Sequence, residues 1–131
     1  MTVLVVDDQP SLRLLLATFL EDVGYRVSGA AHGRDALTYL HQSHELPGLI
    51  LLDIAMPVMS GWEFLSAQQR NRRIAAIPVV VMTALADMTH EGVFPAVVAY
   101  LYKPLDLRRL SEVIAAHYMT PLQAQAVGTA Y

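Results

Sequence analysis

Acidic side chains follow two apolar runs of the sequence, and they are the residues best suited to chemistry. Val3–Val6 leads directly into Asp7 and Asp8, and Leu49–Leu52 leads directly into Asp53. A short apolar run followed by turn-forming residues is typical of a strand buried on both faces. Each run therefore predicts a strand with carboxylates at its carboxyl end, where open α/β sheets bind ligands. Such a carboxylate could act as a nucleophile or a metal ligand; the alternative is that Asp53 only caps the next turn.

Two further apolar runs end in polar residues that suit the same place. Residues 78–82 end at Thr83, and Val97–Tyr102 ends at Lys103. The carboxyl ends of parallel strands share one edge of a sheet, so we expect Thr83 and Lys103 to converge with the three carboxylates. Two carboxylates about 4 Å apart repel by roughly 4 kcal/mol at an effective dielectric constant of about 20, so the cluster needs positive charge.

Lys103 supplies one positive charge, and a divalent cation would supply the rest. Oxygen ligands without histidine or cysteine select a hard ion, Mg²⁺ or Mn²⁺. Mg²⁺ held by a few carboxylates keeps positions open for phosphate oxygens. A lysine charge and a threonine hydroxyl also suit a phosphoryl group. The pattern therefore predicts phosphoryl chemistry with a carboxylate nucleophile.

Helices are predicted between these strands, and together they position the site. The helices are expected at about 10–23, 34–43, 61–73 and 107–117, and a weaker strand at 25–30. In the first helix, Leu15 and Val23 belong to a stripe of residues expected in the core. Asp106 is expected to cap the last helix, whereas Gly92 and Pro95 interrupt residues 85–96. This alternation predicts an α/β fold: a doubly wound, five-stranded parallel sheet with helices on both faces.

The composition limits the classes of protein. The 131 residues, 54% of them hydrophobic, suffice for one ordinary domain with a real core. A net charge of −3 gives no sign of a nucleic-acid-binding surface, and the absence of cysteine excludes disulfides. The longest apolar run is too short to span a bilayer, and the first strand begins at Val3, so no signal peptide is expected. We expect a cytoplasmic protein without nucleic-acid or membrane partners.

These residues resemble the motifs of response-regulator receiver domains of two-component signalling, of the single-domain chemotaxis-regulator type. The matching pieces are Asp7-Asp8, the D-x-x-M-P-x-M-x-G-x-E motif from Asp53 to Glu63, Thr83-Ala84, and Tyr100-x-x-Lys103-Pro104. The resemblance covers about residues 2–118 and implies a flavodoxin-like sheet of order 2-1-3-4-5. We therefore expect a receiver domain at 1–118, and a tail or the start of a linker at 119–131.

The resemblance also implies roles for the acidic residues. Asp53 would be the phospho-acceptor, and Lys103 would pair with the phosphoryl group or with the acceptor carboxylate. Asp8 and Asp53 would bind Mg²⁺ directly and Asp7 largely through water, and the backbone carbonyl of Ala55 would complete the protein ligands.

Three further pieces would read out the phosphoryl group. The Thr83 hydroxyl would shift to bond one phosphoryl oxygen, and the backbone N–H of Ala84 would bond another. Tyr100 would turn inward behind Thr83, and the Lys103–Pro104 peptide would be cis.

The implied function is a signalling switch and not an enzyme, beyond slow self-catalysed phosphorylation and dephosphorylation. A histidine kinase or phosphotransfer protein would supply the phosphoryl group, an unknown downstream protein would bind the switch, and the chain would be a monomer or a weak phosphorylation-dependent dimer. Met1 directly precedes the first strand, so any missing output part is expected to be C-terminal. Alternatives are a Mg²⁺-dependent aspartyl-phosphate phosphohydrolase and a non-phosphorylated docking pseudo-receiver.

The sequence departs from the family pattern around the fifth strand. The segment from Thr83 to Tyr100 is about two residues short, and Val97-Val98-Ala99 replaces the usual Gly-Ala, which puts the usual partner face in doubt. The apolar residues at 93, 94, 97 and 98 could form a partner patch or belong to the core. Ala55 and Leu85 flank the site and cannot hold a water through a side chain, which suggests a long-lived phosphoryl group.

Overall fold

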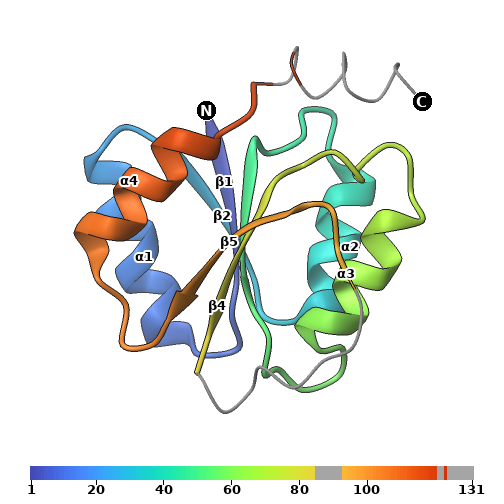
Figure 1. Cartoon of the computed structure of the whole chain (residues 1–131), viewed down its shortest axis with the longest axis horizontal. Helices are drawn as coiled ribbons and strands as arrows, with labels where there is room; N and C mark the ends of the chain where they lie inside the picture. Colours follow the sequence, from blue (N-terminus) through green and yellow to red (C-terminus); the bar gives the residue numbers. More distant parts are fainter. Residues whose placement is uncertain (85–92, 121–122, 124–131) are drawn as a thin grey trace.

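The four apolar runs and the weaker segment at 25–30 form the strands of one parallel sheet. The computed structural model describes residues 1–84, 93–120 and 123 (Figure 1). In chain order the elements are β1 (Thr2–Val6), α1 (Pro10–Asp22), β2 (Arg26–Ala30), α2 (Gly33–Gln42), β3 (Leu49–Asp53), α3 (Gly61–Gln69), β4 (Val79–Thr83), β5 (Val97–Tyr102) and α4 (Leu107–His117). The expected alternation of strands and helices is confirmed from β1 to β4 and from β5 to α4, whereas residues 85–92, between β4 and β5, lie outside the described residues.

The strand order is β2-β1-β3-β4-β5, with every neighbouring pair parallel, as predicted. The register places the carboxyl ends of the strands together: Val6 pairs with Leu52, Asp53 with Met82, and Thr83 with Tyr102. The residues at the carboxyl ends of β1, β3, β4 and β5 therefore meet at one edge of the sheet.

Helices cover both faces of the sheet, because side chains alternate along each strand. Val3 and Val5 of β1 point into one cluster with buried leucines of α1 and α4, whereas Leu4 and Val6 point into another with residues of α2 and α3. Figure 1 shows α1 and α4 on one side of the sheet and α2 and α3 on the other. All five residues of β3 are buried, so Asp53 ends a strand that is shielded from solvent.

The helix boundaries and faces differ from prediction at two places. Leu15 is 52% exposed and Val23 is 47% exposed, so neither belongs to the core. Leu16 and Leu20 are the residues of α1 that meet the sheet; Leu15 lies about 100° round the helix from Leu16, and Val23 follows the last helical residue. The buried face of α1 is therefore narrower than the predicted apolar stripe.

The predicted end of α3 at Arg73 is also wrong, because the helix ends at Gln69. The side chain of Gln68 is buried and donates from Nε2 to the carbonyls of Ile74 and Ile77, at 3.1 and 3.0 Å. These bonds draw the chain back towards α3 as a series of turns, so it cannot continue as a helix.

Two predictions fall wholly or partly outside the described residues. Residues 85–92 and most of 119–131 lie there. Of the four apolar residues near β5, Val93 and Val98 are exposed, whereas Phe94 and Val97 pack against the core. Among the described residues, no helix has the length and apolar character needed to cross a membrane.

The end of α4 is tied to the start of the chain. The backbone N–H of Thr2 donates to the Tyr118 hydroxyl at 2.8 Å, and the N–H of Met119 donates to the Gly48 carbonyl at 2.9 Å. The rings of Tyr25 and Tyr118 are 5.6 Å apart, and burial raises the pKa of Tyr118 above its usual value. A Cβ at position 48 would lie 2.3 Å from the Tyr118 ring, so the contact requires glycine there.

Replacing Tyr118 by Phe removes the acceptor of the Thr2 N–H while leaving the ring in place. We expect the free energy of unfolding to fall by about 1 kcal/mol, the usual net contribution of such a bond. Urea denaturation measures this, with the half-exposed Tyr102→Phe as the matched control. Equal stability of both variants would contradict a contribution from this bond.

Candidate functional site

Lys103 lies between two buried carboxylates at the carboxyl edge of the sheet. Its Nζ is 3.5 Å from Asp7 Oδ2 and 3.5 Å from Asp53 Oδ1. Asp7, which follows β1, is fully buried, and Asp53, at the end of β3, is 4% exposed. The predicted convergence of these three residues is confirmed.

A third carboxylate completes the acidic cluster. Asp7, Asp8 and Asp53 each offer an oxygen that lies within 4.8 Å of the others, and Asp8 is the most open to solvent. Three carboxylates and one ammonium carry a formal charge of −2, which one divalent cation would neutralise. An all-oxygen donor set suits Mg²⁺ or Mn²⁺, so the residues present fit the expected metal.

The environment of Asp53 opposes its charge. Burial raises the pKa of its carboxyl group from 3.8 to about 6, and the charge of Asp7 acts in the same direction. The nearby Lys103 ammonium lowers the pKa, but not enough to offset the other two effects. Asp53 is therefore ionised at neutral pH at a cost to stability, and a bound cation would favour the ionised form.

Asp7 and its neighbours are held by several bonds. Its N–H donates to the Ala30 carbonyl at 3.1 Å, and its Oδ1 accepts from the Gln9 N–H at 2.8 Å. Arg13 Nη1 donates to the Asp7 carbonyl at 2.6 Å. Arg13 is not among the residues singled out from the sequence; its one signal there is a basic residue in the first turn of the helix that follows the acidic pair.

Thr83 and its neighbours lie at the same edge. Thr83 is 1% exposed, and its hydroxyl donates to the carbonyl of the exposed Ala84 at 2.9 Å. The Lys103 N–H donates to the Thr83 carbonyl at 2.9 Å, which ties the end of β5 to the end of β4. Tyr100 is half-buried against the core, and the Lys103–Pro104 peptide is cis, as expected.

The turn after Asp53 is built by residues of the D-x-x-M-P-x-M-x-G-x-E motif. A Cβ at Gly61 would lie 2.7 Å from the Asp53 carbonyl, so the start of α3 can approach β3 this closely only with glycine. Ser60 and Glu63 form a capping box at the start of α3. Val58 has a φ of 67°, a conformation that is strained for a β-branched residue. Part of the motif therefore shapes the turn that presents Asp53.

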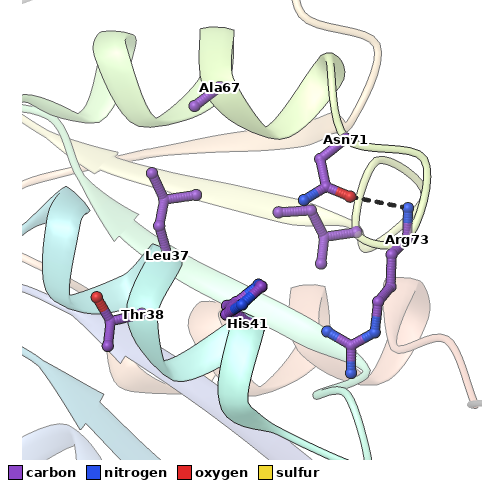
Figure 2. A pocket seen from close by; sticks show the side chains of 7 residues that line it. Leu37, Thr38, His41, Ala67, Asn71 and Arg73 are labelled. Carbon is purple, nitrogen blue, oxygen red and sulfur yellow. Dashed lines mark hydrogen bonds between the residues drawn. The ribbon is translucent and has the colours of Figure 1, made fainter.

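A separate hollow of about 420 Å³ lies between α2 and α3 and contains none of the predicted site residues. Figure 2 shows its lining: Leu37, Thr38, His41, Ala67, Asn71, Arg73 and Ile74. Arg73 donates to the carbonyls of Leu40 and Ser43 at the end of α2. Its charge is therefore already engaged at a helix C-terminus, where cations are favourable.

The raised pKa of Asp53 predicts a pH-dependent difference between the wild type and Asp53→Asn. Because the folded state favours the neutral carboxyl group, the contribution of Asp53 to the free energy of unfolding is fully present below pH 3.8. This contribution is lost as the pH rises through about 6. Without divalent cations, we expect Asp53→Asn to be more stable than wild type by about 1–3 kcal/mol at pH 7.5. The difference should nearly vanish at pH 4. Urea denaturation at both pH values measures it, with the exposed Asp22→Asn as control; equal gains for both variants would contradict this account.

The comparisons with known proteins agree with this geometry. The family model described as the response regulator receiver domain matches residues 3–115. Response regulator Rre1 of Synechocystis sp. is 35% identical over 116 residues, which cover 86% of this chain and 49% of that protein. An uncharacterized 14.6 kDa protein of Leptolyngbya boryana is 34% identical, with 87% of each chain covered. The chain spans about half the length, or less, of the first curated relatives that it matches.

Solved structures of this kind share the fold. A response regulator receiver protein from Pseudomonas putida superposes with a TM-score of 0.75 at 31% identity, over 88% of this chain and 95% of that one. The response regulator TrrA of Thermotoga maritima, solved in complex with Mg²⁺–BeF, gives a TM-score of 0.75 at 28% identity, over 88% and 96%. The chain belongs to the family of response regulator receiver domains, the signalling domains of two-component systems.

Proposed function

We propose that this chain is a phosphorylation-controlled switch that accepts a phosphoryl group on Asp53 from a partner histidine kinase or phosphotransfer protein. One observation carries the proposal: the Lys103 ammonium lies 3.5 Å from each of two buried carboxylates of different strands. Such an arrangement costs stability, and it suits a site that receives a charged group. The fold and the family membership support it, since receiver domains are generally non-enzymatic signalling domains.

Asp53 would act as the nucleophile. One of its oxygens would attack phosphorus, and the bond from phosphorus to the imidazole nitrogen of the donor would break, with the electron pair leaving on the imidazole. Asp53 is presented by a buried strand and a capped turn, so its carboxylate is positioned before the donor arrives. Lys103 would stabilise the charge of the transferred group.

The acidic cluster would hold Mg²⁺ through Asp8, Asp53 and the Ala55 carbonyl, and through Asp7 by way of water. When bound, the ion would neutralise the carboxylates and the charge on the transferred group. The −2 charge of the cluster with Lys103 supports this assignment.

Thr83 and Tyr100 would read out the phosphoryl group. The Thr83 hydroxyl would exchange its bond to the Ala84 carbonyl for a phosphoryl oxygen, and the Ala84 N–H would bond another. Tyr100, half-buried on the neighbouring strand, would move into the space behind Thr83. This population shift would change the surface seen by a downstream protein.

The proposed receiver domain is 1–118, with a tail or linker at 119–131, in a cytoplasmic protein that is a monomer or a weak phosphorylation-dependent dimer. Some relatives carry other names; one is the probable transcriptional regulator ycf27 of Guillardia theta, of which this chain covers 44%. For the residues that the structure describes, we propose that the switch acts by binding another protein.

Incubation with Mg²⁺ and a small acyl phosphate tests the function. We expect intact-mass spectrometry to show one phosphoryl group on the wild type and on the exposed control Asp22→Asn. No adduct is expected on Asp53→Asn or after chelation of the metal. Multiple turnover of a phosphomonoester would favour a phosphohydrolase instead, and a wild type without any adduct would favour a docking pseudo-receiver.

The lifetime of the phosphoryl group depends on what can hold water beside Asp53. Ala55 is exposed two residues beyond Asp53 and has no polar side-chain atom, while Leu85 lies outside the described residues. We expect a half-life of minutes or longer, and a shorter one for Ala55→Asn, which adds an amide that can orient water. Val58→Asn, in the same turn, is the matched control. A wild-type half-life of seconds would contradict the proposal.

A further inference from the structure

Arg13 reaches back from α1 to the peptide that joins the two acidic residues of the β1–α1 loop. Its N–H donates to the Gln9 carbonyl at 3.1 Å, which places it in the first turn of the helix. Its Nη1 donates to the carbonyl of Asp7, which belongs to the Asp7–Asp8 peptide, at 2.6 Å. The Arg13 side chain therefore connects α1 to the peptide between Asp7 and Asp8.

Packing against β2 helps to fix the guanidinium group. The side chain of Arg13 passes over Gly29, where a Cβ would lie 3.6 Å from Arg13 Cδ and 3.8 Å from Nε. These are ordinary contact distances, so the stem lies against the strand and the side chain is half-buried. Because the aliphatic part of the Arg13 side chain is already held, less conformational entropy is lost when its guanidinium group donates a hydrogen bond.

The other polar groups of Asp7 are also engaged. Its N–H bonds Ala30, Oδ1 accepts from Gln9, and Oδ2 faces Lys103. Asp8 is the more open carboxylate, and its backbone position is set by the peptide that Arg13 holds. We infer that Arg13 is a positioning residue of the metal site: it fixes the Asp7–Asp8 peptide so that both carboxylates face Asp53. This inference rests on the proposed function.

The charge of Arg13 and its positioning role predict opposite changes in Mg²⁺ affinity when the side chain is removed. A positive charge near a cation site weakens cation binding, so its removal should tighten the binding of Mg²⁺. Loss of a positioning bond should weaken it, and outer-shell partners of metal sites typically change affinity by roughly tenfold or more. The sign of the change therefore separates the two roles.

The experiment compares Mg²⁺ affinities of the wild type, Arg13→Gln, Arg13→Lys and Arg34→Gln, all as the full chain. Mg²⁺ alone is titrated and binding is followed by amide chemical shifts in NMR. Arg34 is an exposed residue of the first turn of α2, at the same edge of the sheet, so Arg34→Gln controls for the lost charge. We expect Arg13→Gln to bind Mg²⁺ about tenfold more weakly, with Arg13→Lys intermediate. Arg34→Gln should bind as tightly as wild type or slightly tighter.

Hydrogen exchange provides a readout that does not involve the metal. Without Mg²⁺, the Gln9 amide, which bonds Asp7 Oδ1, should lose protection in Arg13→Gln, while the Val6 amide in β1 keeps it. Equal or tighter Mg²⁺ binding by Arg13→Gln would overturn the positioning role of Arg13 and leave the proposed metal site intact. A wild type that binds no Mg²⁺ would overturn the proposed metal site and the role of Arg13 with it. Should Arg13→Gln not fold, Arg13→Lys decides by the same comparison.

Discussion

Mutual repulsion among three carboxylates at one edge of the sheet is the constraint on which the site depends. Asp7 and Asp53 are both buried, and a single ammonium lies between them. Burying a charge costs stability unless the charge is paired and hydrogen-bonded. Here one lysine serves two carboxylates and leaves a negative balance. Burial of Asp53, together with the charge of Asp7, raises the pKa of its carboxyl group. The acidic cluster therefore lowers the stability of the protein, and its negative charge suits a cation.

The parallel sheet makes this arrangement possible. Strands that are distant in sequence end at the same edge, and their hydrophobic residues hold them in register against helices on both faces. The Lys103 N–H bonds the end of β4, so the lysine is anchored by the sheet as well as by its charge. The turn after Asp53 is shaped by Gly61 and the capping box at α3. Several residues of the family motif thus have structural roles that are independent of chemistry.

The sequence allowed prediction where short-range pattern decides structure. Apolar runs followed by turn residues located the strands, and Asp106 with the spacing of the last helix predicted Leu107–His117 correctly. The expected convergence of Lys103 with the acidic residues followed from parallel topology. Leu15 and the end of α3 were predicted wrongly because tertiary contacts decide them: the sheet covers only a narrow stripe of α1, and Gln68 turns the chain back. Arg13 was missed for the same reason, since its stem packs on a strand that no local pattern connects to it.

The bond from Thr2 to the Tyr118 hydroxyl has a practical consequence for protein engineering. It places the first strand and the exit from the last helix side by side at the amino edge, the rim opposite the acidic cluster. A purification tag, fluorescent reporter or fused module attached before Met1 or directly after Met119 would therefore begin at the rim opposite the acidic cluster. The same proximity makes residues 1–119 suitable for circular permutation, because a short peptide could bridge Met1 and Met119.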